Sequence, residues 1–128
     1  MAIEVIQDLG SAAPVGPYSQ GIKAGGFVFV AGEKGIDPDT GKIVNGGIQA
    51  ETKQTFANIE GILLAAGATL EQVVATTVHM VNLEEFQQMN EIYATFFKNN
   101  PPGRTTVGVT SLPAGANVEI TVTAYIGD

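Results

Sequence analysis

The chain of 128 residues is 45% hydrophobic and only 15% charged, and its formal net charge at pH 7 is −7. This length corresponds to a single domain, residues 1–128, with its own buried core. The negative charge argues against nucleic-acid binding and against a basic membrane-binding patch, and the absence of cysteine excludes disulfides and thiolate chemistry.

The first ten residues, MAIEVIQDLG, contain no basic region followed by an apolar core, so we expect no signal peptide. No apolar run approaches the roughly 20 residues needed to span a bilayer, and we therefore expect a cytoplasmic protein. A small domain with so few charged residues has difficulty covering its surface with polar groups. This composition favours self-association of identical chains.

The first half of the chain predicts two strands and a long helix. The continuous apolar run FVFVAG, at 27–32, predicts a strand buried on both faces. The turn residues at 39–41 predict a second strand that pairs back. Apolar residues follow helical spacing from 47 to 67, where Gly67 would end the helix. The residues of this apolar stripe are Phe56, Ile59, Ile62, Leu63 and Ala66.

The second half begins with a β-branched segment, 73–81, which predicts another strand. Asn82 then stands where it can cap a second helix, with Glu85 in the capping-box position. Two prolines at 101–102 end this helix. Its apolar stripe consists of Phe86, Met89, Tyr93, Phe96 and Phe97.

Two further strands complete the chain, one beginning at Arg104 and one over 117–126. The short segment between them predicts that they are antiparallel neighbours. The order of strands and helices indicates an α+β fold, with both helices packed on one face of a single sheet. Two helices do not cover both faces, so we expect identical chains to cover the other face.

Arg104 is the only arginine of the chain. Strand alternation places Arg104 and Thr106 on one face of their strand, and Glu119 opposite the aliphatic residues of the next. If the aliphatic faces meet the helices, Arg104 and Glu119 project together from the second face. Two interpretations remain open. One is a structural cross-strand ion pair; the other is an anion site, in which the guanidinium binds a carboxylate and Glu119 acts as a general base or orients water.

Other polar residues give weaker indications. His79, the only histidine, is expected to be a hydrogen-bonded strand residue, and no cluster of His, Asp and Glu predicts a metal site. Lys34 could form a Schiff base, but is expected to be a solvated loop lysine. Asn90 interrupts the apolar stripe of the second helix, where it is expected to bond to a neighbouring backbone.

Five segments occur in order along the chain: VGPYSQGI (15–22), VFVAG…GIDPDTGKIV (28–44), NEIYATFF (90–97), PPGRTTVGVTSLP (101–113) and NVEITVTA (117–124). Together they resemble the RidA/YjgF family of reactive-intermediate deaminases. The resemblance implies a chorismate-mutase-like α+β fold, assembled as a homotrimer with clefts between subunits. It also implies hydrolysis of 2-imino acids such as 2-iminobutanoate and 2-iminopropanoate, or their enamine tautomers, to 2-keto acids and ammonia, without metal or cofactor.

The resemblance also implies roles for individual residues. By the family pattern, Arg104 binds the substrate carboxylate and Glu119 positions or activates water. Tyr18 lines the cleft as a further catalytic residue. The substrate-binding positions of the pattern also include Ala31, Gly32 and Thr106, which supply backbone or side-chain contacts near the ligand, and Asn90, which supports the site.

The sequence departs from the better-known deaminases of this family at four positions. Ala31 stands where many members have Ser, Glu33 where Gln is usual, Thr106 where Cys is common, and Gly108 where Glu is common. These departures leave open a second function, a non-catalytic trimer that binds small carboxylates as a sensor, regulator or chaperone-like partner. A third function, a nuclease or translation inhibitor, is disfavoured by the net charge of −7.

Overall fold

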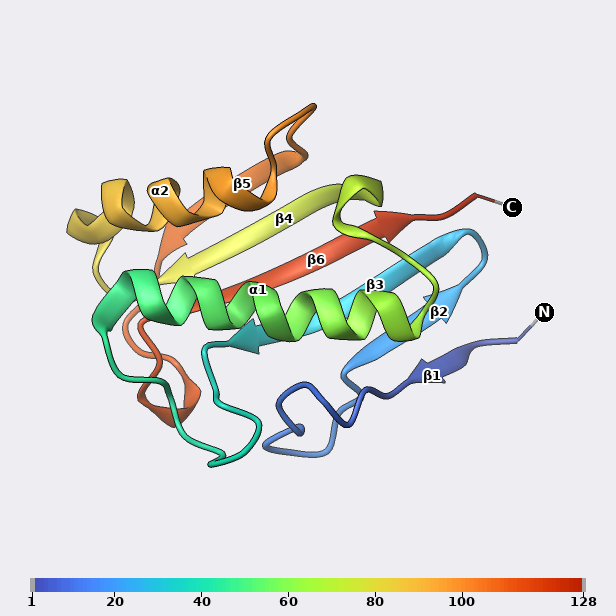
Figure 1. The fold of residues 1–128 in the computed structure, drawn as a ribbon, viewed down its shortest axis with the longest axis horizontal. Coiled ribbons are helices and arrows are strands. Elements are labelled where there is room, and N and C mark those ends of the chain that lie inside the picture. The colour runs from blue at the N-terminus through green and yellow to red at the C-terminus, as the bar shows by residue number, and fades with distance from the viewer. Residues whose placement is uncertain (1, 128) are drawn as a thin grey trace.

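The computed structural model describes residues 2–127. It contains one six-stranded mixed sheet with two helices on one face (Figure 1). The order along the sheet is β1-β2-β3-β6-β4-β5, and all neighbours are antiparallel except β4 and β5. The strands are β1 (Glu4–Ile6), β2 (Gly21–Ala24), β3 (Phe27–Lys34), β4 (Val73–Met80), β5 (Gly103–Gly108) and β6 (Val118–Tyr125). The predicted α+β fold is confirmed.

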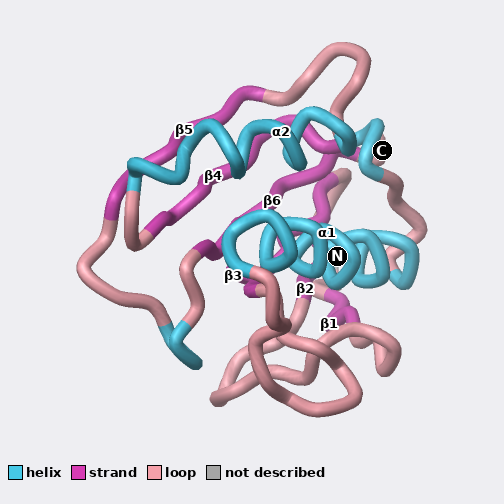
Figure 2. Tube along the Cα trace, turned by 60° about the vertical axis from the view of Figure 1, so that its left-hand side comes forward, coloured by secondary structure: helices cyan, strands magenta, loops and turns pink. Residues whose placement is uncertain are grey.

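Both helices lie on the same side of the strands, with α1 (Gly47–Ala65) packed on β3 and β6 and against α2 (Phe86–Phe96) (Figure 2). Gly67 has a φ of 80°, a left-handed conformation that glycine adopts without strain, and α1 ends just before it, as predicted. The side chain of Asn82 accepts a hydrogen bond from the Glu84 N–H at 3.0 Å and caps the short 3-10 turn that leads into α2. Within residues 2–127, no helix is long and apolar enough to cross a membrane.

The core lies between the sheet and the helices. The aliphatic residues of β6 are buried against the apolar stripe of α1, as the alternation predicted. The ring of Phe56 on α1 stacks on that of Phe96 on α2, with centroids 4.6 Å apart, and joins the two helices. Each large side chain buried in this way contributes about 1.5–3 kcal/mol. The fully buried members include Phe56, Ile59, Ile62, Leu63, Met89, Val118, Ile120 and Val122.

Two predictions for the segment after residue 26 are wrong. The strand is not buried on both faces, because Phe27 and Phe29 are 40% and 45% exposed on the face without helices. The residues beyond it form no second strand; they form one isolated bridge between Ile36 and Ile43. Hydrogen bonds from the Asp37 N–H to the Lys42 carbonyl and from the Gly41 N–H to the Asp37 carbonyl close this segment as a compact turn.

The predicted pairing of the last two strands is also wrong, because β4 lies between β5 and β6. The chain leaves β4, passes through α2 and returns as β5, which is parallel to β4. Parallel neighbours require such a crossover, and a helix usually supplies it. β5 is therefore an edge strand, with no strand paired to its outer side within residues 2–127.

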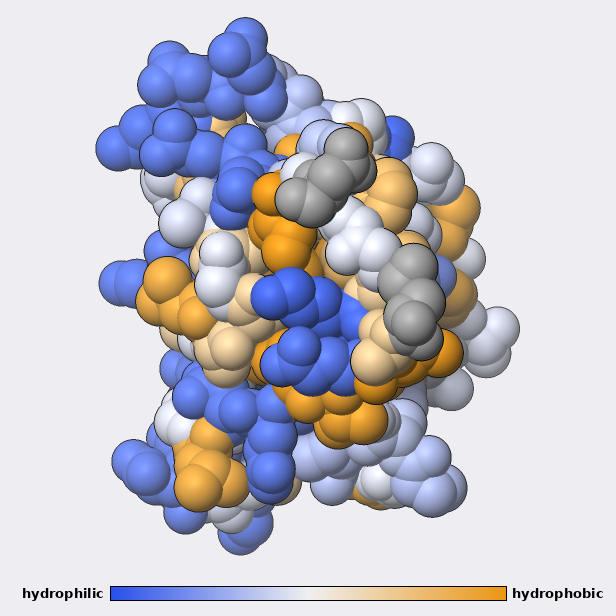
Figure 3. Space-filling model, turned by 90° about the vertical axis from the view of Figure 1, so that its right-hand side faces the viewer, coloured by the Kyte–Doolittle hydropathy of each residue, from blue (hydrophilic) through white to orange (hydrophobic). Residues whose placement is uncertain are grey.

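Aromatic side chains gather on the uncovered face of the sheet, where β3 begins and β6 ends. The ring of Phe27 lies 6.1 Å from that of Phe29 and 5.2 Å from that of Tyr125. At the end of the molecule that carries both termini, hydrophobic surface lies between hydrophilic groups (Figure 3). Exposed aromatic clusters of this kind are typical of interaction surfaces.

Candidate functional site

Arg104 and Glu119 lie on opposite faces of the sheet. Arg104 is the register partner of Thr76 on β4, whose buried hydroxyl is 2.8 Å from the hydroxyl of Tyr93 on α2. Arg104 therefore lies on the helix face. Glu119 is the register partner of His79 and Lys34 and lies on the uncovered face. The prediction that both charged groups project from one face of the same chain is wrong.

The error comes from the assumption that Val107 of β5 and Val109 just beyond it face the helices. Val107 is 38% exposed, whereas Arg104 and Thr106 lie on the side of α2. Because β5 lies at the edge of the sheet, its aliphatic side chain Val107 is not buried under the helices. Aromatic rings of α2 lie beside the guanidinium instead, and Arg104 itself stays exposed.

Three side chains of α2 hold the guanidinium of Arg104. Its Cζ atom lies 4.6 Å from the ring centroid of Tyr93 and 5.4 Å from that of Phe86, both within cation–π range. Its Nη1 donates a hydrogen bond to Asn90 Oδ1 at 2.8 Å, so Asn90 bonds to this side chain and not to backbone as expected. This is the one hydrogen bond of the guanidinium described within residues 2–127. The other N–H donors of the fork remain available to a ligand.

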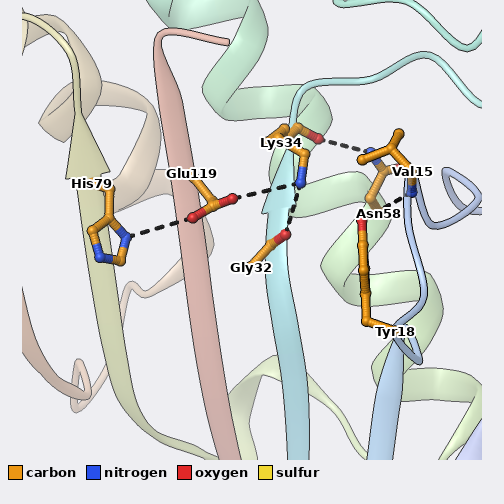
Figure 4. Close-up of polar contacts among 7 residues, drawn as sticks. All are labelled: Val15, Tyr18, Gly32, Lys34, Asn58, His79 and Glu119. Atoms are coloured by element: carbon orange, nitrogen blue, oxygen red, sulfur yellow. Dashed lines mark hydrogen bonds and ion pairs between the residues drawn. The ribbon is translucent and has the colours of Figure 1, made fainter. Parts of the chain in front are cut away.

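On the uncovered face, the carboxylate of Glu119 lies between two basic side chains (Figure 4). Its Oε2 is 3.5 Å from Lys34 Nζ, and its Oε1 is 3.9 Å from His79 Nδ1. Lys34 is only 5% exposed, so the expectation of a solvated loop lysine is wrong. The ring centroid of Tyr18 lies 6.0 Å from Lys34 Nζ, which places Tyr18 beside this cluster.

The glycine at position 32 makes room for the carboxylate. A Cβ atom built on Gly32 would lie 2.8 Å from Glu119 Cδ, closer than side chains tolerate. The neighbouring Ala31 is partly buried, and its N–H donates to the Gln20 carbonyl. The structure thus brings Tyr18, Gly32 and Glu119 to one face, whereas Arg104 and Asn90 lie on the other.

Glu33, which stands out in the sequence only as a departure from the family pattern, is buried in the structure. Burial raises the pKa of its carboxyl group from 4.5 to about 8; the charge of Glu119 adds to the rise and Lys34 opposes it. At neutral pH this group is therefore protonated. The signal in the sequence was a charged pair, Glu33 and Lys34, directly after a continuous apolar run.

Two buried polar atoms have no hydrogen-bond partner within the described residues 2–127, namely His79 Nδ1 and Thr106 Oγ1. The expectation that the His79 side chain is hydrogen-bonded is therefore wrong for this nitrogen. Buried polar groups normally find partners. His79 Nδ1 lies on the uncovered face beside Glu119. Thr106 Oγ1 lies on the helix face, on the same strand as Arg104.

Neither of the two surface cavities described for this chain is lined by a candidate residue. The larger, of about 470 Å³, lies among the C-terminal ends of α1 and α2 and the residues that follow them, including Glu60, Glu71 and Phe96. The smaller lies at the turn around residues 37–45. A single copy of the chain therefore does not enclose the residues that the sequence analysis selected.

Comparison with known proteins establishes the family. The family model described as Endoribonuclease L-PSP matches residues 10–126. A RutC family protein of Pyrococcus abyssi is 46% identical over 125 residues, 98% of each chain. The chain belongs to the RidA/YjgF family.

Two other members of the RidA/YjgF family have more specific names. The 2-iminobutanoate/2-iminopropanoate deaminase of Mus musculus is 39% identical over 124 residues, which cover 97% of this chain and 92% of the mouse protein. The crystal structure of E. coli TdcF with bound serine has a TM-score of 0.91 at 30% identity, over 95% of this chain and 98% of TdcF. The resemblance found in the sequence is confirmed.

Proposed function

We propose that this protein hydrolyses 2-imino acids, or their enamine tautomers, to 2-keto acids and ammonia. The observation that carries the proposal is the pair of charged groups that the family pattern retains. Arg104 is held by α2 with most of its donors free, and the Glu119 side chain lies beside Gly32 and Lys34. These are the two groups that the reaction needs: a fork for the substrate carboxylate and a base for water.

One chain cannot bring both groups to the same ligand, because they lie on opposite faces of its sheet. We therefore infer that each site forms between two copies, one supplying Arg104 and the other Glu119. The free edge of β5 and the exposed aromatic cluster of Phe27, Phe29 and Tyr125 are surfaces suited to such contacts. A closed ring of three identical chains would contain three equivalent sites of this kind.

The reaction in this site follows from the groups present. The Arg104 guanidinium binds the substrate carboxylate through two parallel hydrogen bonds and fixes the imine carbon near Glu119. The carboxylate of Glu119 accepts a proton from water as the water oxygen bonds to the imine carbon, whose nitrogen is already protonated. Glu119 returns that proton to the amino nitrogen of the resulting carbinolamine. The C–N bond then breaks and ammonia leaves, while the hydroxyl oxygen forms the keto group and releases its proton to solvent. General acid–base help of this kind contributes about 10²–10⁴-fold, which is adequate for an imine that also hydrolyses in water.

Two relatives support this choice of ligand. The mouse protein is named for deamination of 2-iminobutanoate and 2-iminopropanoate, and TdcF was crystallised with serine. Both kinds of molecule carry a carboxylate next to the carbon that bears nitrogen. A guanidinium fork binds such a carboxylate in either case.

A coupled assay tests the proposal. Threonine dehydratase with threonine releases 2-iminobutanoate, and the rate of 2-oxobutanoate formation is measured with and without the protein. We expect wild type to accelerate this step, Arg104→Ala to lose the acceleration, and Lys53→Ala, an exposed substitution on α1, to retain it. No acceleration, together with measurable binding of 2-oxobutanoate, would favour the non-catalytic carboxylate-binding function instead.

A further inference from the structure

Lys34 is a buried cation that the mechanism above does not use. It ends β3 and is 5% exposed, so its amino group has lost most of its hydration. Removing a charge from water is costly unless the charge is paired. Two partners are described: the Gly32 carbonyl, which accepts from Nζ at 3.1 Å, and Glu119 Oε2 at 3.5 Å. Of these two, only Glu119 supplies a compensating negative charge.

A β-bulge and a hydrogen bond to the backbone hold Lys34 in this position. A β-bulge between Val30 and Glu33 shifts the register of β3, so that Lys34 becomes the cross-strand neighbour of Glu119. A one-residue shift in register changes the face on which a side chain projects. In addition, Asn58 on α1 donates from Nδ2 to the carbonyl of Lys34 at 3.1 Å, which ties this residue to the helix.

The groups around the Glu119 carboxylate come from three parts of the chain. β3 contributes Lys34 and the protonated Glu33, β4 contributes His79, and the loop before β2 contributes the ring of Tyr18 behind Lys34. Lys34 is the closest cation, and it contacts only Oε2. Within residues 2–127, no hydrogen bond to Oε1 is described; its nearest basic neighbour is His79 Nδ1 at 3.9 Å.

We propose that Lys34 is a positioning residue for Glu119: its ion pair with Oε2 orients this carboxylate so that Oε1 receives the proton of the attacking water. This inference rests on the proposed function. The ammonium group fixes one oxygen of the carboxylate and leaves the other free. Because the substrate carboxylate binds to Arg104 of another copy, Lys34 acts on turnover and not on substrate affinity.

Steady-state kinetics of two substitutions test this role, with Lys53→Met as the control for loss of an exposed lysine. Lys34→Met removes the charge at similar length, and Lys34→Arg retains it. For Lys34→Met we expect the acid limb of the pH–rate profile to move to higher pH, because a carboxylate without its cation is protonated more readily. At pH values below the shifted acid limb, kcat of Lys34→Met is lower than that of wild type by about tenfold or more. The affinity of Lys34→Met for 2-oxobutanoate stays within about twofold of wild type.

Lys34→Arg should retain the wild-type position of the acid limb even if the longer side chain lowers kcat. If both substitutions lower kcat equally with an unchanged pH profile, Lys34 has a packing role and the proposal is wrong. Reduction with borohydride in the presence of 2-oxobutanoate provides another test. A covalent adduct on Lys34 would make it a nucleophile and overturn the positioning role.

A titration of the Glu119 carboxyl carbon by NMR, assigned with Glu119→Gln, separates this inference from the proposed function. We expect its midpoint to lie at higher pH in Lys34→Met than in wild type. If wild type fails to hydrolyse imines but the midpoint still moves, the proposed function fails and the electrostatic link stands. If wild type is active and the midpoint does not move, only the inference on Lys34 fails.

Discussion

Replacing Glu33 by glutamine should stabilise the protein at alkaline pH. The carboxyl group of Glu33 is buried, and this burial, with the charge of Glu119, raises its pKa from 4.5 to about 8 against the opposing effect of Lys34. In the unfolded chain the same group ionises near 4.5. Between these two values the folded protein therefore binds more protons than the unfolded chain. The free energy of unfolding decreases as the pH rises through this window and levels off above about 8.

The size of the effect follows from the two pKa values. The difference between 4.5 and about 8, at about 1.4 kcal/mol per pH unit, corresponds to about 4–5 kcal/mol as an upper limit. Glutamine has nearly the same shape and no charge to bury. We therefore expect Glu33→Gln to be more stable than wild type by about 2–5 kcal/mol at pH 9. At pH 4 the two proteins should be nearly equal, because Glu33 is largely protonated in both the folded and unfolded states.

Urea unfolding at a series of pH values from 4 to 9 measures this difference, at one fixed protein concentration so that any oligomerisation contributes equally. Glu60→Gln, an exposed substitution on α1, is the matched control and should show no such pH dependence. If the stability gained by Glu33→Gln does not grow between pH 5 and pH 8, the buried carboxyl group is not protonated as the structure indicates.

Three other substitutions give separate tests. Arg104→Lys retains the charge but loses the planar fork, so calorimetry should show about tenfold or weaker binding of 2-oxobutanoate; unchanged affinity would contradict the carboxylate-binding role. Tyr93→Phe removes the buried hydrogen bond to Thr76 and should lower the free energy of unfolding in urea by about 1 kcal/mol; an unchanged value would show that this bond adds no net stability. Asn58→Ala removes the buried side chain that bonds to the backbones of Ala12, Lys34 and Ile36. It should lower the free energy of unfolding by about 3 kcal/mol in the same assay, and a loss below about 1 kcal/mol would show that water replaces these bonds.

The helices could be predicted from the sequence because their signals are local. Apolar residues of α1 recur at helical spacing, and Gly67 marks the end of α1 as predicted. The end of α2 was placed too late, because α2 stops at Phe96 and not at the prolines at 101–102. The pairing of β5 could not be predicted in this way. A short connection is compatible with neighbouring strands, but it does not require them. The crossover through α2 places β5 beside β4 instead.

The candidate site shows the same limit. The sequence and its family resemblance selected Arg104 and Glu119, but the spacing of Val107 and Val109 assigned Arg104 to the wrong face. Lys34 was taken for a solvated residue because a β-bulge leaves no clear signal in one sequence, and the bulge is what turns Lys34 towards Glu119. Sites that depend on strand register need coordinates as well as motifs.

The central claim is that Arg104 of one copy and Glu119 of another act on the same ligand. Co-assembly of Arg104→Ala chains with Glu119→Gln chains tests it most directly, because each variant alone should be inactive in the coupled imine assay. In a ring with random equal mixing, about one site in four receives both intact residues, so about a quarter of wild-type activity should return. Mixed assemblies that remain as inactive as the two variants alone would contradict a site shared between copies.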